Sequence, residues 1–176
     1  MCGIAGIFHY GSGAPVDEDL LAQMTDSMGH RGPDGRGTWA SGCVGLGHRR
    51  LAIIDPASGR QPMRSSCSDL WVSFNGEIYN HSELRPALER DGHSFATRCD
   101  TEVILHTYEE RGEAFPEALS GMFAIALWDA GQQKLVLARD RLGIKPLFYY
   151  DSGESLYFAS ELRALLRVRA TPRELD

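Results

Sequence analysis

Two pairs of short apolar segments, each pair joined by turn-forming residues, constrain the possible folds more than any other feature of the sequence. Residues 122–129 and 134–139 flank a glycine-containing linker, and residues 147–150 and 156–159 flank another. Apolar runs at this spacing are typical of β-hairpins. We therefore expect antiparallel strands in the C-terminal half of the chain.

Further strands are expected in the N-terminal half. Short apolar runs predict buried strands at residues 3–10, 44–47 and 70–74. The last of these runs leads into Asn75-Gly76, the dipeptide that most favours a tight hairpin turn. The sequence therefore predicts that this strand ends at residue 74.

Helices are expected where capping residues precede amphipathic segments. Asp17 precedes one such segment, and Asn80 with Glu83 three residues later resembles a capping pair for a second. Asp100 is expected to cap a third helix, and residues 161–166 form a short fourth. Helices and hairpins without a regular βαβ alternation predict an α+β fold with antiparallel sheets.

Length, charge and cysteine content exclude several classes of protein. The 176 residues fit one domain at 1–166, followed by a polar tail at 167–176 that we expect to begin a linker. Acidic and basic residues are interspersed at a net charge of −6, unlike the basic face of a nucleic-acid-binding domain. No segment resembles a membrane span or a signal peptide. Four scattered cysteines predict reduced thiols and a cytoplasmic protein.

Cys2 is the first candidate for catalysis because it directly follows Met1. Removal of methionine would leave an α-amine, which titrates at roughly 7.7–8.0, on the same residue as a thiol that titrates at about 8.5. One residue would then carry both the nucleophile and its base. If Met1 stays, that nitrogen is an amide and cannot accept a proton. Taken alone, Met-Cys is more often an ordinary strand end.

A set of ordered motifs changes that balance, because it resembles the class II glutamine amidotransferase domain of glutamine-hydrolysing asparagine synthetases. The motifs are MCGIAGIF, HRGPDG, LGHRRLAIID, FNGEIYN, DTEVIL, GMFAIALWD, ARDRLGIKPLFYY and FASEL. The resemblance spans nearly the whole chain. It implies the four-layer αββα sandwich of N-terminal-nucleophile hydrolases, with two antiparallel sheets between helical layers.

The resemblance also implies a catalytic group of residues. Cys2 would attack the glutamine carboxamide, while Asn75 and the backbone N–H of Gly76 would form the oxyanion hole. A turn would be the ordinary reading of Asn75-Gly76 outside this motif.

The histidines outside these motifs, His9, His81, His93 and His106, lack metal-ligand spacing. No metal site is therefore predicted.

Further matching residues would bind the amino-acid end of the substrate. Arg50 would pair with the α-carboxylate, for which a guanidinium fork is suited. Asp100, assisted by Glu77, would hold the α-ammonium, and backbone carbonyls near Leu51 and Ile53 would complete that site. The alternative roles are a structural ion pair of Arg50 with Asp55, a helix cap at Asp100 and a solvated Glu77.

Several neighbouring residues are expected to be structural. We expect Arg31 and Asp34 to stabilise the loops around the pocket, and His48 and Arg49 to orient the loop that carries Arg50. His30 is not needed as a base if the Cys2 amine fills that role. The other cysteines, Cys43, Cys67 and Cys99, are expected to be buried small residues.

The resemblance implies a partner and leaves alternatives open. In such synthetases a C-terminal domain uses ATP and Mg²⁺ to activate aspartate, but its SGGxDS loop does not occur here. We therefore expect no cofactor for this domain, L-glutamine as substrate, an ATP-dependent synthetase domain or subunit as partner, and possible homodimerisation through the full-length parent. The alternatives are an N-terminal-cysteine amidase acting on another amide and a non-catalytic docking or regulatory module.

Overall fold

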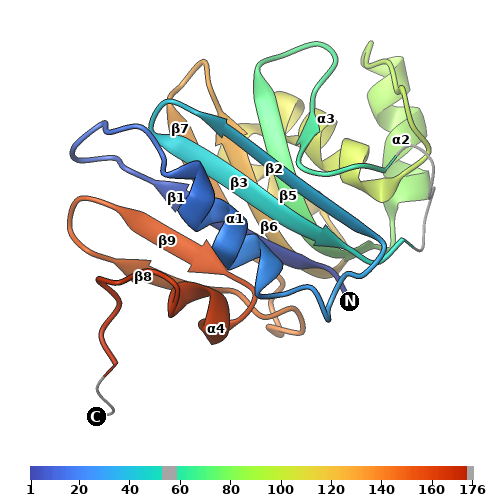
Figure 1. Ribbon diagram of the computed structural model, residues 1–176. Coiled ribbons are helices and arrows are strands. Elements are labelled where there is room, and N and C mark those ends of the chain that lie inside the picture. Colours follow the sequence, from blue (N-terminus) through green and yellow to red (C-terminus); the bar gives the residue numbers. More distant parts are fainter. Residues whose placement is uncertain (53–58, 174–176) are drawn as a thin grey trace.

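The predicted hairpins belong to two antiparallel sheets in the computed structural model, which describes residues 1–52 and 59–173 (Figure 1). The larger sheet has five strands, in the spatial order β2 (Gly35–Ser41), β3 (Val44–Arg50), β1 (Gly3–Phe8), β9 (Leu156–Ala159) and β8 (Phe148–Asp151). The smaller sheet has four, in the order β4 (Met63–Arg64), β5 (Leu70–Ile78), β6 (Gly121–Asp129) and β7 (Lys134–Arg139). Both predicted hairpins, β6–β7 and β8–β9, are confirmed.

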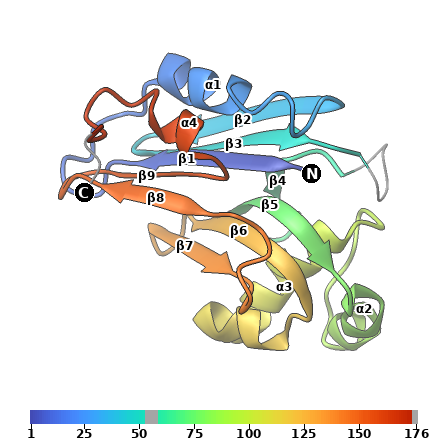
Figure 2. The same ribbon diagram turned by 90° about the horizontal axis from the view of Figure 1, so that it is seen from below.

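Helices cover the outer face of each sheet. The larger sheet carries α1 (Glu18–Asp26) and α4 (Leu162–Leu165), and the smaller carries α2 (His81–Arg90), α3 (Asp100–Arg111) and the 3₁₀ helix η1 (Gly112–Ala118). Figure 2 shows the resulting succession of helix, sheet, sheet and helix. The predicted α+β fold and its four-layer αββα sandwich are confirmed.

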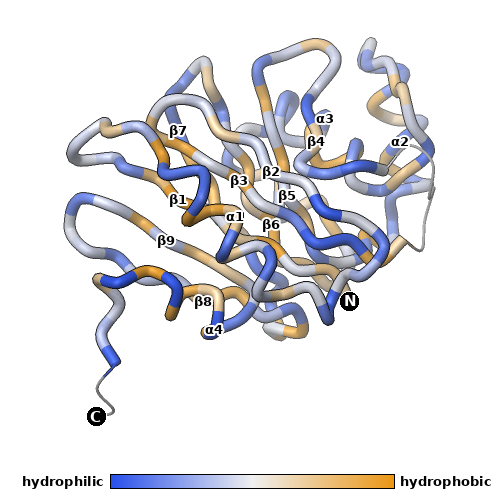
Figure 3. Tube along the Cα trace, viewed as in Figure 1, coloured by the Kyte–Doolittle hydropathy of each residue, from blue (hydrophilic) through white to orange (hydrophobic). Residues whose placement is uncertain are grey.

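Apolar side chains fill each of the three interfaces between these layers. β1, β6 and β9 are largely hydrophobic, whereas β2 and the end of β3 are hydrophilic (Figure 3). Between the sheets lie Ile4, Leu46, Trp128 and Phe158 among others. Glycine also sets one spacing, because a Cβ at Gly47 would lie 2.1 Å from Oγ1 of Thr25 on α1. Only a residue without a side chain lets α1 pack this closely on β3.

The strand predicted to end at residue 74 continues instead to Ile78. Asn75 and Gly76 pair with Ala124 and Phe123 of β6, so the predicted tight turn is wrong. A turn would have ended this pairing, whereas continuous pairing with the long strand β6 places both residues inside the sheet. Tertiary pairing thus overrides the local turn preference of Asn-Gly.

Two of the predicted helix caps differ from the prediction. Asn80 occupies the N-cap position of α2, as predicted, but its side chain does not cap the helix. It donates instead to the carbonyl of Ala118 and accepts the N–H of Ser120, which ties α2 to the end of η1. Asp100 is the first residue of α3, and Cys99 occupies the N-cap position. Asp17, in contrast, caps α1 as predicted, by accepting the N–H of Leu20.

The last described residues pack against the domain. Val168 is buried beneath α1 and α4, and the hydroxyl of Thr171 donates to the carbonyl of Leu165. The packed unit therefore extends at least to Val168, and the linker expected in residues 167–176 stays a prediction. In the described part of the chain, no helix has the length and apolar character that a membrane crossing requires.

Candidate functional site

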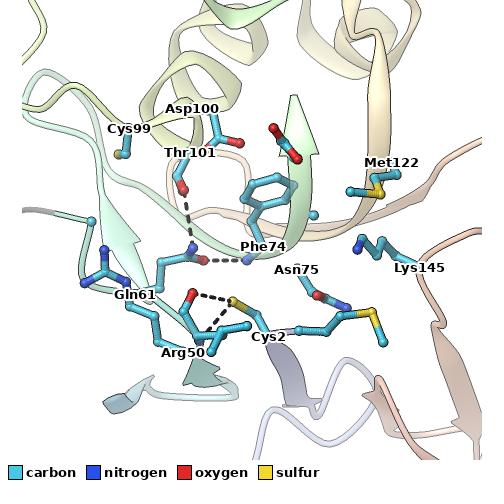
Figure 4. A pocket seen from close by; sticks show the side chains of 15 residues that line it. Cys2, Arg50, Gln61, Phe74, Asn75, Cys99, Asp100, Thr101, Met122 and Lys145 are labelled. Atoms are coloured by element: carbon cyan, nitrogen blue, oxygen red, sulfur yellow. Dashed lines mark hydrogen bonds between the residues drawn. The ribbon is translucent and has the colours of Figure 1, made fainter. Parts of the chain in front are cut away.

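Cys2 lies at the start of β1, on the rim of a cavity of about 240 Å³ (Figure 4). Its sulfur is 3.4 Å from the backbone nitrogen of Leu51 and 3.7 Å from the Leu51 carbonyl oxygen. Met1, which precedes it, is 59% exposed and also lines the cavity. No packing in the core holds Met1 in place, so its removal would leave the Cys2 amine at the cavity.

The backbone around Cys2 is held by side chains from other segments. Arg31 donates from Nε to the Cys2 carbonyl at 2.8 Å, and Arg31 is in turn paired with Glu161 at 3.1 Å. Two residues further along β1, the N–H of Ile4 donates to the Ser160 hydroxyl, and the N–H of Ser160 donates to the Ile4 carbonyl. Arg31 thus has a structural role, as predicted, and the contact it makes is with the candidate nucleophile itself.

Asn75 presents a buried amide to the same cavity. The residue is 1% exposed, and its Nδ2 has no hydrogen-bond partner among the residues that the structure describes. A buried polar atom without a partner costs roughly 1–3 kcal/mol. Such an atom in a folded protein calls for an explanation, and a donor kept free for a ligand oxygen provides one.

The backbone N–H of Gly76 lies on the unpaired edge of β5. Successive N–H groups along a strand alternate in direction, so those of residues 74, 76 and 78 share one edge. On that edge the N–H of Phe74 donates to Gln61 at 2.6 Å, and the N–H of Ile78 donates to Asp100 at 3.0 Å. The N–H of Gly76 points the same way, between these two bonds and toward the cavity.

The partner strand supports this direction for Gly76. Phe123, which lies opposite Gly76, exchanges hydrogen bonds with Asp140 on its other side. Glycine is also required here, because a Cβ would lie 2.2 Å from the carbonyl oxygen of Met122. An amide side chain and a neighbouring backbone N–H therefore reach one cavity from adjacent positions of β5.

Asp100 contributes a buried carboxylate to the cavity from the start of α3. The residue is 6% exposed, and one of its oxygens accepts the N–H of Ile78. Burial raises the pKa of Asp100, and the bond from Ile78 only partly opposes that effect. A cationic ligand group would lower the pKa again, so the carboxylate is suited to bind an ammonium.

The other residues predicted to bind substrate fall into two groups. Arg50, at the end of β3, lines the cavity together with Leu51 and Glu77. Ile53 lies outside the described residues, as does Asp55, the alternative partner considered for Arg50. Asp34 holds this segment as predicted, because it accepts the N–H of Ala52 at 2.9 Å and donates its own N–H to the Arg50 carbonyl.

The structure adds cavity residues that the sequence did not single out. Gln61 accepts from the N–H of Phe74 and lies 3.3 Å from the Thr101 hydroxyl, so it links β5 to α3 across the cavity. Met122 and Lys145 line the opposite side (Figure 4). Lys145 lies within the ARDRLGIKPLFYY motif, which was the only sequence signal that pointed to it.

A carboxylate at the end of β7 fixes the loop that carries Lys145. Asp140 accepts the N–H groups of Phe123, Ile144 and Lys145 at 3.2, 2.8 and 3.0 Å. Burial alone would raise the pKa of Asp140, but these backbone hydrogen bonds outweigh it and hold the pKa below its usual value. The Asp140 carboxylate is therefore occupied by hydrogen bonds from the protein itself.

His48 is not an acid–base residue of the site. Burial lowers its pKa to about 4, and nearby Arg50 acts in the same direction, so the ring is neutral near pH 7. Its Nε2 lies 3.0 Å from the carbonyl oxygen of Phe74, which can only accept, so this nitrogen carries the proton. His48 thereby joins β3 to β5, and its role in orienting the loop that carries Arg50 stays a prediction. The prediction that Cys67 is buried is wrong. The residue is exposed, because it lies in the turn between β4 and β5.

Comparisons with known proteins agree with this geometry. A family model described as a glutamine amidotransferase domain matches residues 1–176. Glutamine-hydrolysing asparagine synthetase 2 of Bacillus subtilis is 42% identical over the whole of this chain, which corresponds to 24% of that protein. Asparagine synthetase B of Escherichia coli is 42% identical over 99% of this chain and 31% of its own length.

The fold likewise has a counterpart among solved structures. Glutamine phosphoribosylpyrophosphate amidotransferase from B. subtilis, complexed with ADP and GMP, superposes with a TM-score of 0.81 and 25% identity. The match covers 97% of this chain and 44% of that one. The chain thus spans less than half of the proteins that it resembles. Matched over its whole length, it belongs to the family of glutamine amidotransferase domains.

Proposed function

We propose that this chain hydrolyses L-glutamine to glutamate and ammonia, with Cys2 as the nucleophile. The observation that carries the proposal is the buried amide of Asn75, whose Nδ2 has no partner among the described residues and lines the same cavity as Cys2. Acyl transfer through a thiolate generates an oxyanion that needs such a donor. The family membership supports the same reaction.

The proposed reaction begins with proton transfer within Cys2. After removal of Met1, the α-amine takes the thiol proton, directly or through a water, and the thiolate attacks the side-chain carbonyl carbon of glutamine. The oxygen of the tetrahedral intermediate accepts hydrogen bonds from Asn75 Nδ2 and the N–H of Gly76. The ammonium of Cys2 then returns the proton to the leaving nitrogen, which departs as ammonia and leaves a γ-glutamyl thioester. Water hydrolyses the thioester to glutamate and regenerates the thiol.

Charge at the cavity supports a free amino acid as the substrate. Arg50 and Asp100 carry opposite charges and both line the cavity, matching an α-carboxylate and an α-ammonium. An N-acylated substrate would carry no ammonium group for Asp100 to bind. The cavity of about 240 Å³ is also smaller than the pockets of drug-sized ligands, which fits one amino acid.

We further propose that the ammonia is consumed by an ATP-dependent synthetase part of a longer protein or complex. The chain corresponds to 24% to 31% of the glutamine-hydrolysing asparagine synthetases that it matches. Aspartate is the acceptor that these relatives suggest. The glutaminase half recognises only glutamine, so the acceptor has to be identified with the complete protein.

A pair of cysteine variants tests the glutaminase proposal. In Cys2→Ala, release of glutamate from glutamine is expected to fall to background, because no thioester can form. Cys67→Ala is the matched control, since Cys67 is exposed and does not line the cavity, and it should keep wild-type activity. Retention of glutaminase activity by Cys2→Ala would refute the proposal. Faster hydrolysis of an N-acylated amide than of glutamine would instead favour the alternative amidase.

A further inference from the structure

Two histidines and a glutamate meet beside α3, and none of the three lines the cavity. His106 and Glu109 belong to α3, and His93 lies in the segment between α2 and α3. One nitrogen from each ring and one carboxylate oxygen all lie within 4.8 Å of one another. His93 and His106 show no metal-binding spacing in the sequence, and only the fold brings them together.

The contacts converge on a single oxygen. Oε2 of Glu109 lies 2.7 Å from Nδ1 of His106 and 3.2 Å from Nδ1 of His93. The two rings are neighbours, with their centroids 4.7 Å apart. The His106 side chain is 1% exposed, and those of His93 and Glu109 are 13% and 15% exposed. The three ligand atoms therefore sit in a largely desolvated position.

Both ring nitrogens of His93 face carboxylates. Its Nδ1 faces Glu109, and its Nε2 lies 2.7 Å from Oε1 of Glu110.

We propose that His93 Nδ1, His106 Nδ1 and Glu109 Oε2 form a binding site for a divalent transition metal of the Zn²⁺ class. Two imidazole nitrogens and one carboxylate oxygen are a donor set that Zn²⁺ accepts, with water as the fourth ligand. Ligand atoms about 2.0–2.2 Å from one ion lie no more than about 4.4 Å from each other. Both separations from Glu109 Oε2 meet this limit, and the three ligand atoms all lie within 4.8 Å of one another.

The surrounding contacts match the outer shell of a metal site. Histidine ligands usually donate their second N–H to a carboxylate, as Nε2 of His93 is placed to do toward Glu110. Ligand carboxylates are usually hydrogen-bonded as well, and the hydroxyls of Ser65 and Ser68 donate to Oε1 of Glu109. Nε2 of His106, which has no hydrogen bond in the described structure, lies 3.9 Å from Glu102.

The proposed role of the ion is to fix the segment between α2 and α3 onto α3. That segment leads directly to Cys99 and Asp100, which line the cavity. A metal held by His93 on one side and by two α3 residues on the other would restrict this approach to α3. The site is separate from the glutaminase residues, so the proposal does not depend on the function proposed for Cys2.

Zn²⁺ binding in metal-free buffer tests the proposal. The Cys2 amine and thiol could themselves chelate zinc, so all measurements use a Cys2→Ala background. Competition with a chromophoric chelator should reveal one equivalent of bound Zn²⁺, and Co²⁺ should give the visible absorption of a four-coordinate site. Zn²⁺ should also raise the melting temperature. Absence of stoichiometric binding would overturn the proposal.

Variants define the ligand set. His93→Gln and Glu109→Gln should each weaken Zn²⁺ binding by more than about 100-fold, and Glu110→Gln, which removes an outer-shell partner, by about 10–100-fold. His9→Gln and Cys67→Ser are the matched controls and should leave the affinity unchanged, because neither residue belongs to the cluster. Equal binding by His93→Gln, or a loss in Cys67→Ser as large as in His93→Gln, would contradict the assigned ligands.

Discussion

The start of α3 and the loop after β7 each bury an aspartate to the same extent, but they treat its charge in opposite ways. Asp100 and Asp140 are both 6% exposed. The N–H groups of Phe123, Ile144 and Lys145 donate to Asp140, whereas Asp100 accepts the N–H of Ile78. The pKa of Asp140 lies below its usual value because of these bonds, whereas burial raises the pKa of Asp100.

This difference separates a structural carboxylate from the one that we propose to bind the substrate ammonium. The hydrogen-bonding capacity of Asp140 is used to shape the loop that carries Lys145. Asp100 keeps capacity for a group that is not part of the protein, and Asn75 Nδ2 does the same on β5. Burial alone therefore does not distinguish the two aspartates, whereas the hydrogen bonds that each carboxylate accepts from the protein do.

The largest effect is expected when the charge of Asp100 is removed. In Asp100→Asn, the bound α-ammonium loses its counter-charge, which costs about 2–5 kcal/mol and lowers kcat/KM for glutamine roughly 30- to 5,000-fold. The free energy of unfolding at pH 7 should stay the same or rise, because the substitution removes a buried charge whose desolvation the hydrogen bond from Ile78 only partly offsets. Steady-state kinetics and urea denaturation measure the two quantities. A large loss of stability with unchanged KM would make Asp100 a structural residue like Asp140.

The pH dependence of substrate binding sharpens the same point. The raised pKa of Asp100 means that its carboxylate protonates at a higher pH than an ordinary aspartate does. The KM for glutamine should therefore begin to rise during acidification at a pH above the usual aspartate range, while Asp100→Asn shows no such rise. A wild-type KM that stays flat down to the ordinary aspartate pKa would contradict this assignment.

Removal of the unpaired amide is expected to affect the rate and not the fold. Asn75→Ala should lower kcat by about 10²–10³, as loss of one oxyanion donor does. The free energy of unfolding should not fall by more than the small packing loss, since the deleted Nδ2 makes no hydrogen bond within the described structure. Ser73→Ala, two residues earlier on β5, is the control, because it removes a satisfied hydrogen bond to Gly47 and should affect stability before rate.

His48 is a third buried titratable group, and it should be visible in stability as a function of pH. The unfolded chain takes up a proton near pH 6.5, but the folded ring does so only at about 4, so stability falls as the pH drops through this window. Across the whole window the free energy of unfolding falls by roughly 3 kcal/mol. His48→Gln, which cannot titrate, should remove this part of the pH dependence. Denaturation curves that fall equally steeply in both proteins would contradict the lowered pKa.

The smallest effect is expected at the structural carboxylate. Asp140→Asn should lower the free energy of unfolding by about 1.5–3 kcal/mol, the value of a hydrogen bond to a charged group. The loss should be present above the usual aspartate pKa and vanish at lower pH, where the wild-type carboxylate is also neutral. Chemical denaturation at pH 7, and at a series of pH values that descends below the usual aspartate pKa, provides the comparison. A variant that is as stable as wild type at pH 7 would remove the distinction between the two aspartates.

Much of the fold and part of the site were predictable from local patterns. Hairpin spacing gave both antiparallel pairs, and the ordered motifs led to Cys2, Arg50 and Asp100, all of which line one cavity. Sequence position was sufficient for these residues because each is embedded in a motif. Their chemical roles remain proposals until the variants are measured.

The remaining features depend on contacts that no local pattern encodes. The turn predicted at Asn75-Gly76 gave way to pairing with β6, and the unpaired edge of β5 follows from that pairing. Gln61 reaches the cavity through bonds to Phe74 and Thr101, which are distant in the chain. The cluster around Glu109 likewise requires the segment after α2 to fold back onto α3.

The account is tested most directly at the first residue of the mature chain. Two forms of the protein, one that retains Met1 and one cleaved to begin at Cys2, should be verified by intact mass and then assayed for glutamate release from glutamine. The form that begins at Cys2 is predicted to hydrolyse glutamine and to show a γ-glutamyl adduct on Cys2 when quenched, while the form with Met1 stays inactive. Equal activity in both forms, or none in a folded and reduced protein that begins at Cys2, would contradict the account.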